Sequence, residues 1–153
     1  KTVEITNWTK QYDPARLVNS ASGGNYFHCS DILDMHNYPE PKMRLMDAHR
    51  ANVVGEYGGI GYALEGHLWA PDRNWGYIQF KSSKEVTDKY VEYAKMLLEL
   101  TKLGVCGAVY TQTTDVEIEV NGFMTYDRKV VKMDEARIAE INKKISHSLD
   151  NTK

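Results

Sequence analysis

The sequence predicts an α/β domain built on a parallel sheet. Four short apolar segments are each followed by polar, glycine-rich or proline-rich residues. This pattern is typical of parallel strands that carry functional loops at their carboxyl ends. These segments are residues 17–20, 32–37, 51–56 and 105–111. Helical patterns or long loops separate them, which is the element order of a parallel α/β sheet. On this pattern alone, the default architecture is a small open doubly wound sheet.

The chain opens in a predicted helix that ends at Asp13-Pro14, because the residue before a proline is disfavoured in the α region. Apolar side chains recur near helical spacing at Val3, Ile5, Trp8 and Tyr12. Strand candidate 17–20 then runs into glycine-rich residues. Strand candidate 32–37 is closed by Tyr38-Pro39, and candidate 51–56 ends at Tyr57-Gly58-Gly59.

Residues 57–81 have no steady period and are expected to form a long loop, a kind of segment that is usually functional inside a compact domain. Ser82 and Glu85 form a capping box that begins a helix with one apolar face, and this helix ends at Gly104. Strand candidate 105–111 follows. The last predicted helix begins behind an Asp134 N-cap and runs to about Ser148.

Composition excludes several classes of protein. The chain has 153 residues, of which 42% are apolar, and it can bury a core without disulfides or a metal. Nineteen Lys and Arg face twenty-one Asp and Glu with no basic run, so we expect no nucleic-acid partner. No apolar stretch approaches the roughly 20 residues of a membrane helix, so we expect no membrane partner. Cys29 and Cys106 lack metal-ligand spacing and are expected to be buried free thiols, with no metal site and no cofactor.

Glu56 is the leading candidate for chemistry. It ends an otherwise apolar strand and is followed by glycines that let a ligand approach the backbone, as catalytic carboxylates at strand ends are in barrel enzymes. A solvated glutamate at a strand end is the alternative. His36 and Tyr38 end the preceding strand, and Asp34 points to the same side as His36 because side chains repeat every two residues. These residues are candidates for the same pocket, with a hydrogen-bonded packing role as the alternative for His36.

Residues 110–117 carry many hydrogen-bonding side chains, which suits a polyhydroxylated ligand such as a sugar. Gln112, Asp115 and Glu117 are the binding candidates in this run, and a polar surface turn is the alternative. Trp69 and Trp75 are candidates for stacking against the apolar face of a sugar ring. A small core within their own loop would explain the two tryptophans equally well.

An ordered set of motifs carries a family resemblance over roughly Trp8 to Lys132. The set comprises Leu17–Gly23, Asp34–Pro39, Val54–Gly59, Gly66–Trp69, Gly107–Glu117 and Asn121–Arg128. Together these motifs resemble the carboxyl-terminal half of the catalytic (β/α)8 barrel of glycoside hydrolase family 2, the β-galactosidase and β-glucuronidase family. The resemblance implies that residues 1–153 are a single partial domain that holds strands five to eight of such a barrel.

The resemblance also implies roles for individual residues. Glu56 matches the catalytic nucleophile of a retaining exo-β-glycosidase, and Tyr38 matches the aromatic residue whose hydroxyl approaches it. His36, Trp69, Gln112, Asp115 and Glu117 are then pocket candidates that contact a β-linked glycoside. The family's acid/base is the Glu of an Asn-Glu dipeptide on the fourth strand, and no such dipeptide occurs here. We therefore expect the acid/base half to lie upstream and the chain alone to be inactive.

A second hypothesis belongs to another class of protein. Without the acid/base, the chain would be a non-catalytic carbohydrate-binding or assembly module that keeps half of a barrel for its surface. In either case a half-barrel exposes two unpaired strand edges, near 17–20 and near 105–111, and unpaired edges recruit other chains. We therefore expect a homo-oligomer that forms through these edges.

Overall fold

The structure is a computed structural model that describes residues 1–24 and 26–150. Asn25 and residues 151–153, which the predicted domain includes, lie outside the described part. The elements are α1 (Thr2–Tyr12), β1 (Ile32–His36), β2 (Ala51–Gly58), β3 (Ile60–Tyr62), β4 (Ile78–Phe80), α2 (Ser83–Lys102), β5 (Val105–Thr111) and α3 (Glu135–Ser146).

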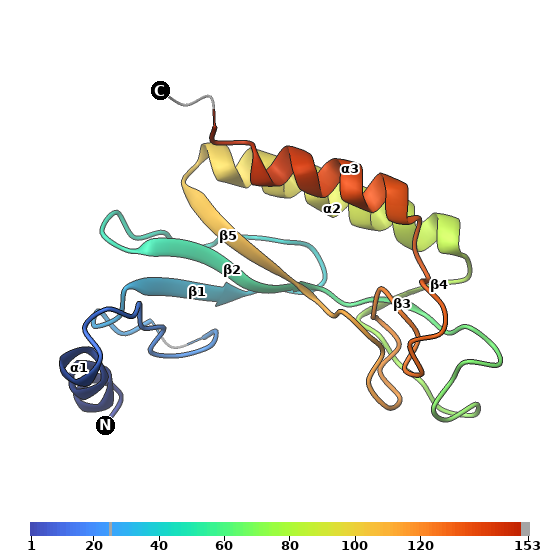
Figure 1. Ribbon diagram of the computed structural model, residues 1–153, viewed down its shortest axis with the longest axis horizontal. Coiled ribbons are helices and arrows are strands. Elements are labelled where there is room, and N and C mark those ends of the chain that lie inside the picture. The colour runs from blue at the N-terminus through green and yellow to red at the C-terminus, as the bar shows by residue number, and fades with distance from the viewer. Residues whose placement is uncertain (25, 151–153) are drawn as a thin grey trace.

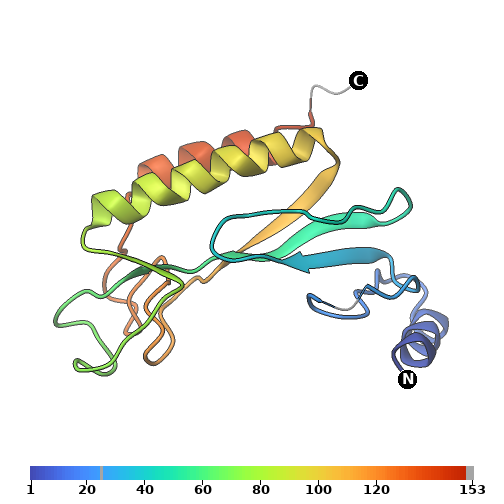
Figure 2. The same cartoon turned by 180° about the vertical axis from the view of Figure 1, so that it is seen from behind.

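The main sheet has three parallel strands in the order β1-β2-β5, so the predicted α/β class with a parallel sheet is confirmed. Helices α2 and α3 pack side by side on the same side of this sheet, while α1 lies at the far end, below β1 (Figures 1 and 2). Among the described residues, the strands do not close into a barrel. No helix in this part of the chain is long and apolar enough to cross a membrane.

Local sequence signals place the helices as expected. The Ser82 hydroxyl accepts a hydrogen bond from the Glu85 amide, and the Glu85 carboxylate accepts one from the Lys81 amide, so the start of α2 is satisfied from both directions. The Asp134 carboxylate accepts from the Arg137 amide at the start of α3. Helix α1 ends at Tyr12, directly before Asp13-Pro14.

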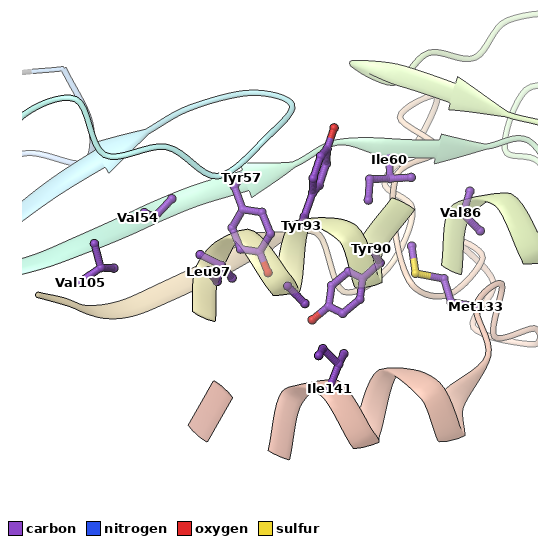
Figure 3. Packing of buried hydrophobic residues seen from close by; sticks show 11 residues of the cluster. Val54, Tyr57, Ile60, Val86, Tyr90, Tyr93, Leu97, Val105, Met133 and Ile141 are labelled. Atoms are coloured by element: carbon purple, nitrogen blue, oxygen red, sulfur yellow. The ribbon is translucent and has the colours of Figure 1, made fainter. Parts of the chain in front are cut away.

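The core lies between the sheet and α2, and α3 closes it from outside. Val54 and Tyr57 of β2 and Val105 of β5 meet Tyr93 and Leu97 of α2 (Figure 3). Tyr90 of α2 faces Ile141 of α3, and its hydroxyl donates to the Asn142 side chain at 2.7 Å. This packing fixes β2, and therefore the residues at its carboxyl end.

Residues 17–20 were predicted to form a strand, and this prediction is wrong. The segment lies beside the start of β1, but within the described part of the chain its one backbone hydrogen bond there is from the Asp31 amide to the Val18 carbonyl at 3.0 Å. The Val18 amide donates instead to the Asp31 carboxylate at 2.9 Å. A side chain thus takes the hydrogen bond that a strand ladder would have used.

Two further expectations need correction. The long loop expected at 57–81 contains β3 and β4, which pair in parallel as a second small sheet. Both cysteines are free as expected, but neither is buried, and Cys106 is exposed on β5. Helix α1 forms where it was predicted, with Val3, Ile5, Trp8 and Tyr12 exposed and Thr6 buried.

The outer edge of β5 is where we expect self-association. β2 pairs with one side of β5, and Cys106, Ala108 and Val109 are exposed along this strand. We expect the chain to sediment as a dimer at micromolar concentration, because unpaired strand edges recruit other strands. Val109→Lys should shift it toward a 17.5 kDa monomer in sedimentation equilibrium. Val116→Lys is the control, because Val116 is equally exposed but lies outside the sheet. A wild-type chain that sediments as a monomer would contradict this expectation.

Candidate active site

Glu56 lies near the carboxyl end of β2, with its side chain 40% exposed. Its Oε2 atom accepts a hydrogen bond from the Tyr38 hydroxyl at 2.8 Å and lies 3.2 Å from His36 Nδ1. The strand register shifts between Met35 and His36 in the β1–β2 pair and again after Val54 in the β2–β5 pair. Such irregularities re-aim side chains at strand ends. The structure therefore brings three of the predicted site residues, Glu56, His36 and Tyr38, into contact.

A second carboxylate, that of Asp34, lies on the other side of the His36 ring from Glu56. Asp34 Oδ1 lies 3.5 Å from His36 Nε2, and Asp34 Oδ2 accepts a hydrogen bond from the Asn19 side chain at 2.6 Å. The Ser22 hydroxyl also lies 3.2 Å from His36 Nε2. Asp34 is buried, and its Oδ1 has no hydrogen-bond partner among the residues that the structure describes. His36 thus bridges a buried carboxylate and the half-exposed carboxylate of Glu56.

Gly55 makes room for this arrangement. A Cβ atom at position 55 would lie 1.8 Å from Asp34 Oδ1. We expect Gly55→Ala to lower the free energy of unfolding by about 1–3 kcal/mol, because either Asp34 or the strand must move. Urea titration followed by circular dichroism measures this change.

Gly107→Ala is the matched control, because a Cβ there would meet Val53 at an ordinary 3.4 Å. It should change the free energy of unfolding by less than about 0.5 kcal/mol. Equal effects of the two substitutions would show that Asp34 does not crowd Gly55.

Tyr38 is held against Glu56 by a second aromatic ring. Its ring stacks on that of Tyr77, with centroids 3.9 Å apart and planes 5° from parallel. Burial raises the pKa of the Tyr38 hydroxyl above its ordinary value; the Thr111 side chain opposes this effect and the Glu56 carboxylate adds to it. Tyr38 therefore stays protonated and donates to Glu56 at neutral pH. A hollow of about 370 Å³ opens beside His36 and Tyr38, with Arg44 and Tyr26 in its wall.

Gln112 directly follows β5 and belongs to a series of hydrogen-bonded polar side chains. Its side-chain amide donates to Asn121 Oδ1 at 3.0 Å, and Asn121 Nδ2 donates to Glu119 Oε1 at 3.0 Å. The Thr111–Gln112 peptide bond is cis, as is Tyr38–Pro39. Asn121 is fully buried and Gln112 is partly exposed. Gln112 is thus a fixed hydrogen-bonding group at the carboxyl end of the sheet.

Asp115 is part of a buried ion pair. Its Oδ1 accepts hydrogen bonds from Lys132 Nζ at 2.7 Å and from the Gly122 amide at 2.8 Å. Lys132 Nζ also donates to the carbonyls of Tyr62 and Val120, each at 2.9 Å. Burial raises the pKa of Asp115 and lowers that of Lys132, and the charge of each partner opposes the shift. These bonds occupy Asp115 in holding the loop after β5.

Two other predicted site residues lie in different surroundings. Glu117 is exposed, with a φ of 51°, in the turn between Val116 and Glu119. Trp69 is 61% exposed and packs edge-on against Tyr126, at 5.6 Å between ring centroids. The neighbouring His67 Nδ1 lies 2.9 Å from Asp127 Oδ2, so the loop that carries Trp69 is fastened to residues 126–127.

The fastening at Asp127 should make this loop sensitive to acid. Hydrogen bonds from the Thr125 hydroxyl, His67 and the Lys129 amide lower the pKa of Asp127 from 3.8 to about 2. A carboxylate with a lowered pKa stabilises the fold above pH 3.8, and this contribution is lost as the pH falls through about 2. We expect Asp127→Asn to weaken the acid dependence of unfolding in that range, as monitored by tryptophan fluorescence.

Asp72→Asn serves as the control for this measurement, because Asp72 is an exposed aspartate. It should leave the acid dependence of unfolding close to that of the wild type. An Asp127→Asn variant with an unchanged acid profile would contradict the role given to Asp127.

Sequence reasoning missed several residues around Glu56. Asn19 was assigned to a strand, yet its side chain holds Asp34. Tyr77 was placed in a loop without a role, yet it stacks on Tyr38. The aromatic spacing Trp75-Gly76-Tyr77 was the available signal for Tyr77, since alternate residues share a face in an extended segment. Asn19 lies in the Leu17–Gly23 motif of the family resemblance, but that motif did not predict its contact with Asp34.

The site can support nucleophilic chemistry at a carboxylate. Glu56 is accessible, its Oε2 accepts a hydrogen bond from Tyr38, and His36 lies beside it, 3.5 Å from the buried Asp34 carboxylate. Among the described residues, no group of three or more His, Cys, Asp or Glu side chains could hold a metal ion. Neither a known protein-family model nor a curated protein matches the sequence.

Proposed function

We propose that the chain is part of the catalytic domain of a retaining exo-β-glycosidase of the β-galactosidase type, with Glu56 as the nucleophile. The observation that carries the proposal is the Glu56 carboxylate at the end of the central strand, accessible to solvent and bonded by the Tyr38 hydroxyl at 2.8 Å. A carboxylate held in one orientation at a strand end suits attack on an anomeric carbon.

In this mechanism Glu56 forms a bond to the anomeric carbon while the bond to the leaving oxygen breaks. An acid donates a proton to that oxygen, and the same group later takes a proton from the water that releases the sugar. The second carboxyl group must lie about 5 to 5.5 Å from the first. Because the sequence has no Asn-Glu dipeptide, we propose that a segment outside these 153 residues supplies the acid.

The arrangement of the elements supports a barrel over a doubly wound sheet. The parallel strands follow one another in chain order as β1-β2-β5. Helices α2 and α3 lie on one side of them, whereas α1 lies at the far end below β1 and, within the described residues, is not among the elements with several contacts to the sheet. A doubly wound sheet has helices on both faces. In the proposed barrel, β1, β2 and β5 are strands six, seven and eight, and residues 17–20 take the place of strand five.

The remaining predicted residues have different parts in this proposal. His36 and Gln112 are placed to hydrogen-bond a sugar, because His36 ends β1, Gln112 directly follows β5 and both are partly exposed. Asp115 acts indirectly, by holding the loop that follows Gln112. Trp69 and Glu117 contact the sugar only if its far end reaches the loops that carry them.

Covalent labelling tests the proposal directly. A longer protein that contains this chain and the acid/base segment is treated with 2-deoxy-2-fluoro-β-galactosyl fluoride, which traps the glycosyl-enzyme. Mass spectrometry of peptides is expected to find one fluorosugar on the peptide that contains Glu56, and none in Glu56→Gln. Glu65→Gln, at an exposed glutamate, is the control and should label normally. A label on another residue, or none at all, contradicts the proposal.

A carbohydrate-binding module remains the second candidate, and one observation favours it. Trp75 and Tyr77 expose 41% and 50% of their surface beside the site. Exposed aromatic rings bind sugars without any catalytic group. Sugar binding together with an absence of labelling at Glu56 would select this candidate.

A further inference from the structure

Two exposed aromatic rings continue outward from Glu56. Tyr38 donates to Glu56, Tyr77 stacks on Tyr38, and Trp75 meets Tyr77 edge-on at 5.4 Å between ring centroids. Large aromatic side chains usually bury most of their area, and these two are about half exposed although they lie among ordered neighbours. The rings of Tyr38, Tyr77 and Trp75 therefore form a continuous aromatic surface that leads from the Glu56 carboxylate to solvent.

The backbone beneath these rings is fixed. The Trp75 amide donates to the Ile118 carbonyl and the Val120 amide donates to the Trp75 carbonyl, both at 2.9 Å. Gly59 has a φ of +63°, and a Cβ there would lie 2.3 Å from the Tyr77 ring. Glycine at position 59 thus lets the Tyr77 ring lie directly against the loop that follows Glu56. Rings held in this way lose little conformational entropy when a ligand binds.

The negative charges around this aromatic surface favour a neutral ligand over an anionic one. Glu56 accepts a hydrogen bond from Tyr38, on which Tyr77 stacks, and Glu119 pairs with Trp75 in a parallel β-bridge, so an acidic residue lies at either end of this aromatic series. Burial, and then the carboxylates of Glu119 and Glu56, raise the pKa of the Tyr77 hydroxyl. An anionic ring stacked here would meet two carboxylates, whereas a neutral pyranose would present only hydroxyls and an apolar face.

We propose that Tyr77 and Trp75 form a stacking surface for a neutral pyranose ring, next to the ring that Glu56 attacks. This rests on the proposed function, and it assigns the substrate class: a neutral β-linked di- or oligosaccharide, with its second ring on these aromatics. A uronic acid at this position is disfavoured by Glu56 and Glu119.

Fluorine NMR tests the surface without requiring catalysis. The chain has three tryptophans, Trp8, Trp69 and Trp75, so labelling with 5-fluorotryptophan gives three resonances that single Trp→Phe variants assign. Titration with lactose is expected to shift the Trp75 resonance with a millimolar dissociation constant. Trp69 is the internal control, because it is also exposed but pairs with Tyr126. The resonances of Trp69 and Trp8 should stay unchanged in lactose. In sorbitol, all three tryptophan resonances should stay unchanged.

Two variants at Tyr77 separate stacking from folding. Tyr77→Phe keeps the ring and should keep binding, whereas Tyr77→Leu should weaken lactose binding by about tenfold, as expected for the loss of one aromatic contact. An unchanged Trp69 resonance in both variants shows that they fold. Methyl β-D-glucuronide should bind more weakly than methyl β-D-glucoside.

Three results would overturn the inference. They are an unchanged Trp75 chemical shift in lactose, an equal change of this shift in sorbitol, or lactose binding by Tyr77→Leu with wild-type affinity. Stronger binding of the glucuronide would overturn the assignment of a neutral ring. The outcome is separable from that of the labelling experiment. Lactose binding without a label on Glu56 would reject the proposed glycosidase function and support the stacking surface. A label on Glu56 without a change in the Trp75 chemical shift would support the function and reject the stacking surface.

Discussion

Glu56→Gln, made in a longer protein that carries the acid/base segment, is expected to lower turnover of nitrophenyl β-galactoside by about a thousandfold or more, which is ~4 kcal/mol in the barrier. Glutamine keeps the size of the side chain and its oxygen can still accept the Tyr38 hydrogen bond. The substitution removes only the negative charge that attacks the anomeric carbon. Circular dichroism should show an unchanged fold.

The controls for this experiment use the same assay. Glu65→Gln should retain wild-type turnover, because Glu65 is exposed in a loop away from the three-stranded sheet. The 153-residue chain alone should show no turnover, because it lacks an acid partner for Glu56. If the Glu56→Gln variant kept more than about a tenth of wild-type turnover, ~1.4 kcal/mol in barrier, Glu56 would not be the nucleophile.

The largest effect on stability is expected at the buried ion pair. Asp115→Ala should lower the free energy of unfolding by about 3–5 kcal/mol, because it leaves the Lys132 charge buried without its partner. The side chains of Lys132 and Asp115 are 1% and 3% exposed, so water cannot replace the lost contact. The Gly122 amide loses its acceptor as well. Urea denaturation followed by fluorescence measures the change.

Two companion variants test this explanation. Glu117→Ala, two residues away and exposed, should change the free energy of unfolding by less than about 0.5 kcal/mol. Adding Lys132→Met to Asp115→Ala should recover part of the loss, because it removes the unpaired charge. An Asp115→Ala variant within about 1 kcal/mol of the wild type would falsify the assignment of a charged pair.

Local signals in the sequence were sufficient for most of the secondary structure. Ser82 with Glu85 and Asp134 with Arg137 satisfy the first amides of α2 and α3 within a few residues, so no distant contact is needed to place these helix starts. The apolar runs at β1, β2 and β5 were likewise sufficient to place these strands, although only β1 is buried along most of its length and β5 is largely exposed.

Failures arose where a distant group decided the outcome. Residues 17–20 read as a strand, but the Asp31 carboxylate takes the Val18 amide. β3 and β4 each have three residues, too few for a period to show, and they exist because they pair with each other.

For the candidate site, the sequence by itself determined the chemical groups and their places at the ends of strands. Glu56, His36 and Tyr38 were identifiable because parallel strands bring their carboxyl ends to one edge of a sheet. Only the tertiary structure decided the partners. It paired Asp115 with Lys132, stacked Tyr77 on Tyr38 and set Asn19 against Asp34. These contacts join residues 15 to 39 positions apart, and Gly55 and Gly59 leave room for Asp34 and Tyr77, which local periodicity does not encode.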